Sequence, residues 1–260
     1  MRAKKRYGQH FLQGAWADKL VDAMQPRRDD RFVEIGPGPG ALTLRLASRV
    51  AQVTAIEVDP EMAATLRPQL PGNVTLVVDD VLDADLESLA GDGPLRMAGN
   101  LPYNVSSPIL SRVLGLHRSR GGIVDATFML QREVAERIES GPGSKDYGVL
   151  SILVQLHADV RRLLTLPPGA FRPQPKVHSA VVRLSFRPPA VVLRDEQLFE
   201  RMVKTMFMQR RKTLSNALKP FADTRNRPAS AALADAGIDP RRRPETLQLT
   251  ELARLADAFG

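Results

Sequence analysis

The sequence predicts an α/β fold with a doubly wound, mostly parallel sheet and a small helical domain at its C-terminal end. Short runs rich in β-branched residues alternate with segments of helical spacing through most of the chain. A glycine-rich turn follows the first of these runs, and beyond residue 190 the pattern becomes wholly helical. The chain has 260 residues, 43% of them hydrophobic, which is enough apolar material for a core.

Seven runs have the composition of strands, and helical segments separate most of them. The expected strands cover residues 31–35, 53–58, 74–78, 95–98, 122–130, 160–166 and 177–186. Helical spacing is found at residues 15–24, 41–50 and 131–139, and helix starts are expected at Pro60 and at Ser107-Pro108. The last two strands have only a proline-rich loop, residues 167–175, between them, so an antiparallel edge is expected there.

A domain boundary is expected at Arg187-Pro-Pro-Ala190. Beyond it, helical spacing recurs at residues 198–208, 213–221, 229–236 and 251–259. We therefore expect a first domain over residues 1–187 and a small basic helical domain over residues 188–260.

Charge is distributed unevenly along the chain. The formal net charge is +8, made up of +5 in residues 1–28, −2 in residues 29–186 and +5 in residues 187–260. This pattern indicates a catalytic body whose two ends bind a polyanion such as nucleic acid. The alternative is an arginine-rich composition without function, but such a bias would also raise the charge of the middle segment.

Several classes of protein are disfavoured by what the sequence lacks. It has no cysteine, and its four histidines are scattered without metal-ligand spacing, so neither a thiolate nor a metal site is expected. No apolar run is long enough for a membrane span, and the basic N-terminus lacks the apolar segment of a signal peptide. A soluble, cytoplasmic protein is expected.

The turn Gly36-Pro-Gly-Pro-Gly40 stands between a strand and a helix, where a nucleotide-bearing cofactor binds in folds of this kind. Glu57, at the end of the next strand, can accept hydrogen bonds from ribose hydroxyls. The glycines alone also match a dinucleotide-binding pattern, so a nicotinamide-dependent oxidoreductase is an alternative. Two prolines remove N–H donors that a pyrophosphate needs, and this favours S-adenosylmethionine, which has no phosphate. Asp80, just after the third strand, is placed to accept from the adenine amino group, or to act as an ordinary cap.

The tetrapeptide Asn100-Leu-Pro-Tyr103 follows the fourth strand at the edge where active sites of such sheets form. The side-chain oxygen of Asn100 and the carbonyl of Leu101 can accept hydrogen bonds from an exocyclic amino group of a base. These bonds would direct the nitrogen lone pair toward a methyl donor, while Pro102 stiffens the loop. Tyr103 offers a ring on which an extruded base can stack. A proline turn with a core tyrosine is the alternative without function.

Nearly the whole chain resembles the ribosomal RNA adenine N6-dimethyltransferase family. The blocks that carry the resemblance are Arg6-Tyr-Gly-Gln-His-Phe-Leu12, Glu34-Ile-Gly-Pro-Gly38, Ile56-Glu-Val-Asp59, Asn100-Leu-Pro-Tyr-Asn-Val-Ser106, Gln131-Arg-Glu-Val-Ala135, Phe171-Arg-Pro-Gln-Pro-Lys-Val177 and Gln209-Arg-Arg-Lys-Thr213. Their presence in this order is far more specific than any one block. The resemblance implies a Rossmann-like class I methyltransferase fold, in agreement with the seven strands expected above.

The resemblance also assigns roles to individual positions. It implies cofactor contacts from seven residues: His10, Leu12, Gly36, Gly38, Glu57, Asp80 and Asn100. Tyr103 and Phe171 would enclose the target adenine, and the basic run Arg210, Arg211 and Lys212 is expected to bind RNA. The family usually has Asn where this chain has His10.

Two activities occur within this superfamily. One is dimethylation of two adjacent adenosines in the 3′-terminal hairpin loop of small-subunit (16S) rRNA during 30S ribosome biogenesis. The other is methylation of a large-subunit adenine, which confers macrolide resistance. The blocks at 103–108, 210–216 and 237–240 are similar to the small-subunit branch, so we expect a monomer that acts on the pre-30S particle. A non-catalytic assembly factor of the same fold is a further alternative, although it would not need Asn100 and Tyr103.

Overall fold

The computed structural model describes residues 10–260, which form two compact units. The basic residues 1–6 and the start of the motif at 6–12 lie outside this described part. The first unit has two segments, one that ends at Ala135 and one that covers Asp159–Phe186. The second unit consists of Glu136–Ala158 and Arg187–Gly260. The expectation of a domain over 1–187 differs from this division, because residues 136–158 pack with the C-terminal helices.

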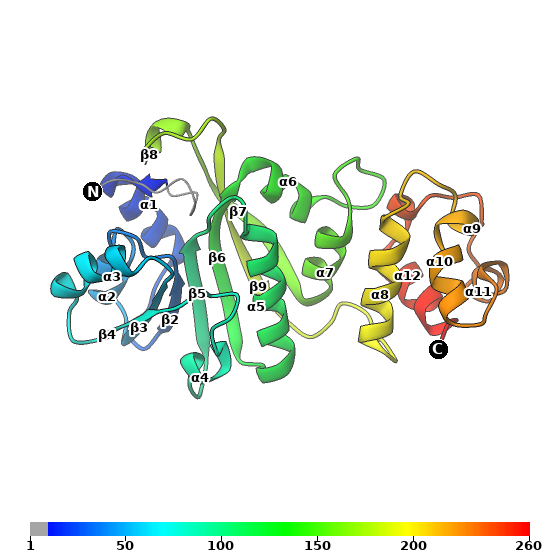
Figure 1. Cartoon of the computed structure of the whole chain (residues 1–260), viewed down its shortest axis with the longest axis horizontal. Coiled ribbons are helices and arrows are strands. Elements are labelled where there is room, and N and C mark those ends of the chain that lie inside the picture. The colour runs from blue at the N-terminus through cyan, green and yellow to red at the C-terminus, as the bar shows by residue number, and fades with distance from the viewer. Residues whose placement is uncertain (1–9) are drawn as a thin grey trace. The chain divides into compact units, whose positions relative to one another are not determined.

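The first unit is built on a seven-stranded mixed sheet, which confirms the expected fold class (Figure 1). The strand order is β4-β3-β2-β5-β6-β9-β7. The pairs β2–β3, β3–β4, β2–β5 and β5–β6 are parallel, and β6–β9 is antiparallel. The strands are β2 (Arg31–Ile35), β3 (Gln52–Glu57), β4 (Val74–Val78), β5 (Leu95–Asn100), β6 (Ile123–Gln131), β7 (Ala158–Leu166) and β9 (Ser179–Phe186).

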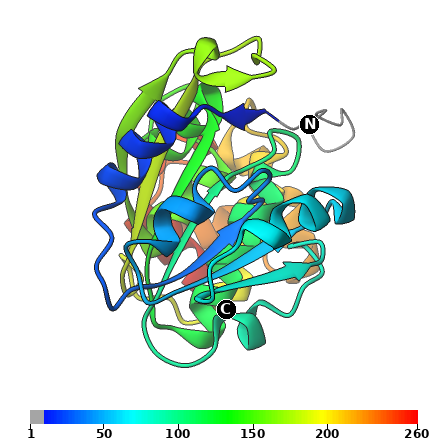
Figure 2. The same ribbon diagram turned by 90° about the vertical axis from the view of Figure 1, so that its left-hand side faces the viewer.

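A second, two-stranded sheet closes over one end of the first unit. Strand β1 (Phe11–Leu12) pairs antiparallel with β8 (Phe171–Arg172), so the start of the described chain lies beside the loop between β7 and β9 (Figure 2). The backbone N–H of Gln13 extends this contact by donating to the carbonyl of Ala170 at 2.9 Å. Two-residue strands have no periodicity, so the sequence gives no signal for this sheet.

Most helices of the first unit begin near their expected positions. They are α1 (Gly14–Met24), α2 (Thr43–Ala47), α3 (Pro60–Leu66), α4 (Leu86–Ala90) and α5 (Ser106–Arg120), with short 3₁₀ turns at Arg67–Gln69 and Pro168–Ala170. Helix α6 (Arg132–Glu139) begins in the first unit and ends in the second. Asp59 caps α3 by accepting from the N–H of Glu61 at 3.1 Å, directly before Pro60. Ser107 does not cap α5 as expected, because that helix begins one residue earlier and has no side-chain cap.

A buried arginine joins α1 to the sheet. The guanidinium of Arg96 donates to both carboxylate oxygens of Asp125 at 2.9 and 2.7 Å, and to Asp30 at 2.7 Å. It also donates to the carbonyl of Met24, the last residue of α1, at 2.7 Å. These bonds satisfy a buried cation and fix the end of α1 against β5 and β6.

The second unit is helical and has its own core. Its helices are α7 (Val149–His157), α8 (Glu196–Phe207), α9 (Leu214–Ala217), α10 (Lys219–Thr224), α11 (Ala229–Asp235) and α12 (Leu249–Asp257), with a 3₁₀ turn at Pro244–Thr246. Tyr147, Ile152 and Leu156 belong to the same buried cluster as Phe199 and Leu252. The helix expected at 213–221 is divided into α9 and α10, and Pro220 stands in the first turn of α10.

Within residues 10–260, no helix combines the length and the apolar character that crossing a membrane requires.

Candidate active site

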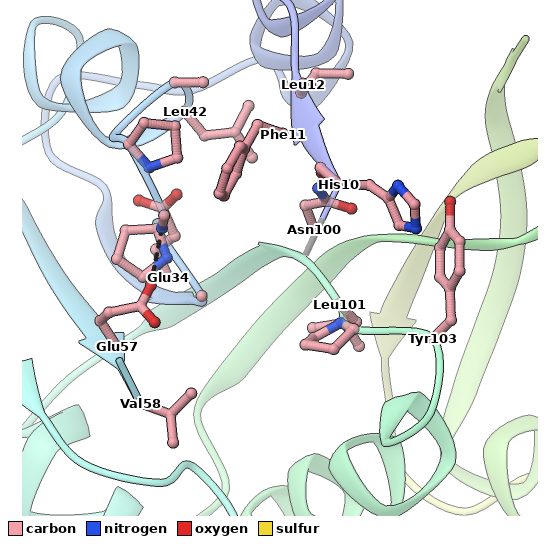
Figure 3. A pocket seen from close by; sticks show the side chains of 16 residues that line it. His10, Phe11, Leu12, Glu34, Leu42, Glu57, Val58, Asn100, Leu101 and Tyr103 are labelled. Carbon is pink, nitrogen blue, oxygen red and sulfur yellow. Dashed lines mark hydrogen bonds between the residues drawn. The ribbon is translucent and has the colours of Figure 1, made fainter. Parts of the chain in front are cut away.

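The candidate site lies where the strand order of the sheet reverses. From β2 the chain proceeds to β3 on one side, and it later returns to β5 on the other side. Ligands of open α/β sheets bind beyond the carboxyl ends of the strands at such a switch point. A cavity of about 70 Å³ lies there, and its lining comes from β1, the glycine turn after β2, the end of β3 and the loop after β5 (Figure 3).

The glycine turn has a backbone conformation that residues with a side chain rarely adopt. Gly36, Gly38 and Gly40 have φ values of +69°, +54° and +85°, in the left-handed region that favours glycine. A Cβ on Gly40 would lie only 2.5 Å from a methyl carbon of Leu66 in α3. Gly36 and Gly38 thus bring bare backbone to the cavity, as close approach of a cofactor requires, whereas Gly40 packs against α3.

Glu57 is held at the end of β3 by backbone N–H groups. Its two carboxylate oxygens accept from the N–H groups of Gly38 at 3.0 Å and of Asp59 at 2.9 Å. Burial raises the pKa of Glu57, while hydrogen bonds from the backbone of Asp59, Gly38 and Val58 oppose that shift. A carboxylate has about four acceptor positions, so two remain for hydroxyl donors.

Glu34 is a second buried carboxyl group at the cavity, and it was noted in the sequence only as part of a motif. It lies on β2 with 1% of its surface exposed, and burial raises its pKa to about 7. The nearby carboxylate of Glu57 acts in the same direction. Its Oε2 has no hydrogen-bond partner among the described residues. A buried carboxyl in this state favours a cationic or hydrogen-donating ligand.

Asp80 lies at a neighbouring cavity of about 270 Å³. The two cavities share Gly36, Val58 and Pro102 in their linings. One carboxylate oxygen of Asp80 accepts from the N–H of Leu82 at 2.9 Å, as in an ordinary turn. Its other oxygen has no hydrogen bond within residues 10–260 and can receive a donor.

Asn100 is oriented by one hydrogen bond. Its Nδ2 donates to the carbonyl of His10 at 2.7 Å, so the amide oxygen is directed away from that carbonyl and accepts no hydrogen bond within residues 10–260. The N–H of Leu101 donates to the carbonyl of Met129 in β6 at 3.1 Å, which holds the loop to the sheet. The carbonyl of Leu101 also has no hydrogen-bond partner among the described residues. The site therefore holds two unpaired oxygen acceptors in adjacent residues.

Tyr103 borders the same cavity. Its hydroxyl shares a 2.7 Å hydrogen bond with Ser179, a fully buried residue at the start of β9. The ring stacked on Tyr103 is that of His10, with centroids 5.4 Å apart. His10, directly before β1, and Leu12, in β1, thus both line the site, and Leu12 is largely buried.

Phe171 is fully buried in this structure and packs in the core with Leu12, Leu166 and Val181. It is not among the residues that line the cavity beside Tyr103. The expectation that Phe171 and Tyr103 enclose the adenine stays a prediction.

The basic run after α8 belongs to the second unit. Arg211 and Lys212 are exposed, whereas Arg210 donates to the backbone carbonyl of Lys145 at 2.6 Å.

Within the described residues, no cluster of three or more histidine or acidic side chains could hold a metal ion.

The donor set fits S-adenosylmethionine. A bare glycine backbone admits a ligand closely, Glu57 has acceptor positions for ribose hydroxyls, and Glu34 has an unpaired oxygen beside the turn. Pro37 and Pro39 leave few N–H donors for a phosphate. The fold and this site define the class of S-adenosylmethionine-dependent methyltransferases.

Comparison with known proteins identifies the family. The family model described as "Ribosomal RNA adenine dimethylase" matches residues 1–258, and the chain belongs to that family. Ribosomal RNA small subunit methyltransferase A of Syntrophotalea carbinolica is 45% identical over 257 residues, which cover 98% of this chain and 96% of that protein. The protein of the same name from Pseudomonas fluorescens is 44% identical over 266 residues, 100% of this chain and 94% of the other.

Two solved structures share the fold across nearly the whole chain. A dimethyladenosine transferase from Plasmodium falciparum has a TM-score of 0.78 at 23% identity and covers 95% of this chain and 96% of its own. The 23S rRNA methyltransferase ErmE has a TM-score of 0.69 at 27% identity, covering 96% and 99%. This protein is thus an S-adenosylmethionine-dependent enzyme of the adenine dimethylase family.

Proposed function

We propose that this protein transfers methyl groups from S-adenosylmethionine to N6 of two adjacent adenosines in the 3′-terminal hairpin loop of small-subunit rRNA. The substrate is the pre-30S particle, and the enzyme acts as a monomer in the cytoplasm. Full-length relatives at 44–45% identity that carry the name small subunit methyltransferase A support this activity over large-subunit methylation.

The observation that carries the proposal is the orientation of Asn100. Its Nδ2 is engaged by the carbonyl of His10 at 2.7 Å, so Oδ1 is the atom that accepts from a substrate. Oδ1 and the carbonyl of Leu101 then accept one hydrogen bond each from the two protons of an exocyclic amine. These bonds weaken delocalisation of the nitrogen lone pair into the base and direct it at the methyl group.

The bound cofactor supplies an electrophilic methyl group on a sulfonium. The N6–C bond forms as the C–S bond breaks, and the amine then loses one proton to water, so no strong general base is needed. Tyr103 positions the base by stacking. The first transfer leaves one N–H proton, which either acceptor can hold during the second.

The basic run at Arg210, Arg211 and Lys212 is proposed to contact the RNA backbone. The +5 net charge of residues 187–260 supports this, because charge neutralisation of phosphates supplies much of the affinity for RNA.

The activity is tested with tritium-labelled cofactor and ribosomal particles from a strain that lacks the modification. Label should enter 30S particles as dimethyladenosine and be absent from 50S particles, while bare transcripts show whether assembly is required. Label in 50S particles alone would transfer the assignment to the large subunit. Binding of 30S particles without any label would instead indicate an assembly factor.

A further inference from the structure

The loop between β4 and α4 forms one wall of the cavity of about 270 Å³. Asp79, Asp80, Val81 and Leu82 are the loop residues in its lining. The backbone N–H of Asp79 donates to the carbonyl of Glu57 at 3.1 Å, which attaches the start of the loop to β3. Beyond Asp79 the loop leaves the sheet, so other contacts must fix the position of Asp80.

Hydrogen bonds within the loop shape its turn. The carbonyl of Asp80 accepts from the N–H groups of Asp83 at 2.9 Å and of Ala84 at 2.8 Å. One carboxylate oxygen of Asp80 accepts from the N–H of Leu82, and the other has no hydrogen bond within residues 10–260. These bonds set the path of the chain from Asp80 to Ala84, but they do not determine where this turn lies relative to the other walls of the cavity.

Helix α5 forms another wall, and one of its side chains holds the loop. Val105, directly before the helix, and Ile109 both line the cavity. Arg112 follows Ile109 by three residues, and side chains at this spacing are neighbours on a helix surface. The Nε of Arg112 donates to the carbonyl of Val81 at 3.0 Å, and its Nη2 donates to the carbonyl of Ala84. Arg112 thus joins two walls of one cavity without lining it itself.

The guanidinium group suits this contact because its N–H donors have a fixed planar arrangement. Two of them bind carbonyls that are three residues apart in the chain, and Val81 and Ala84 are both buried. Arg112 forms no ion pair among the described residues, so its effect here is geometric. Val81 directly follows Asp80, and a shift of the contact at Val81 therefore also moves the Asp80 carboxylate.

We propose that Arg112 is a positioning residue for cofactor recognition: it holds the loop where the unpaired carboxylate oxygen of Asp80 can accept from the amino group of the cofactor's adenine. This inference rests on the proposed function and on the contact expected of Asp80, and it names the residue that fixes the position of that contact. Arg112 itself does not touch the cofactor.

The test compares two ligands, S-adenosylhomocysteine and S-inosylhomocysteine. In the second ligand an oxygen replaces the adenine amino group, so it offers Asp80 no donor at that position. Wild-type enzyme should bind S-adenosylhomocysteine about tenfold more tightly or better, which is the order of effect of a hydrogen bond to a charged group. Calorimetric titration without RNA measures both dissociation constants.

Arg112→Ala should remove most of this preference. The Kd for S-adenosylhomocysteine should rise about tenfold, while the Kd for S-inosylhomocysteine stays within about twofold of wild type, because only the first ligand loses a hydrogen bond. Arg112→Lys keeps the charge but not the planar pair of donors, so it should behave like Arg112→Ala. In an Asp80→Ala background, Arg112→Ala should change the ratio of the two constants no further, because both residues act on one contact.

Arg120→Ala is the matched control. Arg120 lies on the same helix and donates to the backbone carbonyls of Gly91 at 3.2 Å and of Gly93 at 2.8 Å, in a loop that lines neither cavity. Arg112→Ala and Arg120→Ala each remove bonds from a guanidinium to a loop, so both should lower the temperature of unfolding. Arg120→Ala should leave the ratio of the two dissociation constants at its wild-type value.

Three results would overturn the proposal. The first is an Arg112→Ala enzyme that keeps the wild-type preference for S-adenosylhomocysteine. The second is an equal loss of affinity for both ligands, which would make Arg112 a stabilising contact of the fold only. The third is a wild-type enzyme that binds the two ligands equally. Failure of the proposed function is a separate result, because it appears as absence of label in 30S particles and these titrations contain no RNA.

Discussion

The side chain of Asn100 has one hydrogen bond within residues 10–260, and that bond determines which of its two amide atoms faces a substrate. A sequence motif can place an asparagine in a loop, but only the contact with His10 distinguishes its donor end from its acceptor end. The function of this residue therefore depends on a backbone carbonyl 90 positions earlier in the chain.

Asn100→Ala should reduce methyl transfer about a hundred- to thousandfold, the order of effect seen when an oriented polar group at a reacting centre is removed. Cofactor affinity should stay within an order of magnitude, because Glu57 and the glycine turn are unchanged. Single-turnover label transfer and calorimetric titration measure the two quantities. Near-normal transfer in this variant would refute the acceptor role.

Glu34 should make stability depend on pH in an unusual direction. Its pKa is raised to about 7 in the folded protein from 4.5, so the folded state keeps the proton longer than the unfolded chain. The free energy of unfolding therefore falls as pH rises from about 4.5 to about 7, and this contribution is constant above that window.

Glu34→Gln removes this titration while keeping the shape of the side chain. Between pH 4.5 and 7.5 the variant should lose less stability than wild type, by about 2–3 kcal/mol. Urea unfolding at a series of pH values gives the comparison, and the values near pH 4, where both side chains are neutral, provide the internal control. Parallel pH profiles would show that Glu34 titrates normally.

The strands of the seven-stranded sheet could be predicted from the sequence, whereas the two-stranded sheet of β1 and β8 could not. Runs such as Val74–Val78 and Arg31–Ile35 match the strands found, since strands are rich in β-branched residues. The pairing of β1 with β8 was not predictable, because two-residue strands about 160 positions apart carry no periodic signal.

The glycine turn gives a prediction with a matched control. Gly40 and Gly143 both have φ of +85°, but a Cβ would meet Leu66 at 2.5 Å at the first position and nothing within 4 Å at the second. Gly143→Ala should therefore cost only backbone strain, about 1–2 kcal/mol. Gly40→Ala should cost a further 1–3 kcal/mol or so from overpacking, and should weaken cofactor binding.

Thermal unfolding and calorimetric titration of the two variants distinguish these contributions. Equal losses of stability would mean that α3 moves aside without cost. Wild-type cofactor affinity in Gly40→Ala would show that the turn does not form part of the binding site.

Over the whole molecule, charge and fold were readable from the sequence, whereas the division into units was not. The net charge of +5 in residues 187–260 and the helical spacing there indicated a basic helical domain. Residues 136–158 were assigned to the first domain, because a helix such as Val149–His157 has the same periodicity whichever core it joins. Only the contact of Tyr147 and Ile152 with the C-terminal helices shows where they belong.

The proposed RNA contact predicts a change in salt dependence. Replacing Arg211 and Lys212 by Gln should lower the magnitude of the slope of log affinity against log salt by about 1.4–1.8, because each lost phosphate contact contributes roughly 0.7–0.9. Binding to 30S particles, measured by filter retention from 50 to about 200 mM salt, gives the slope.

Arg194→Gln with Arg254→Gln provides the control, because it removes the same charge from exposed positions of the same unit. If both pairs lower the slope equally, the affinity reflects net charge and not the run after α8.

Because its core draws on two stretches separated by β7 to β9, the helical unit cannot be obtained by cutting the chain once. A fragment that starts at residue 187 lacks Tyr147, Ile152 and Leu156 and would expose the apolar surface they cover. During synthesis, residues 136–158 leave the ribosome well before the C-terminal helices. They can complete their core only after those helices have been made. Exchange of this unit between relatives would accordingly require three crossovers, at the junctions 135/136, 158/159 and 186/187.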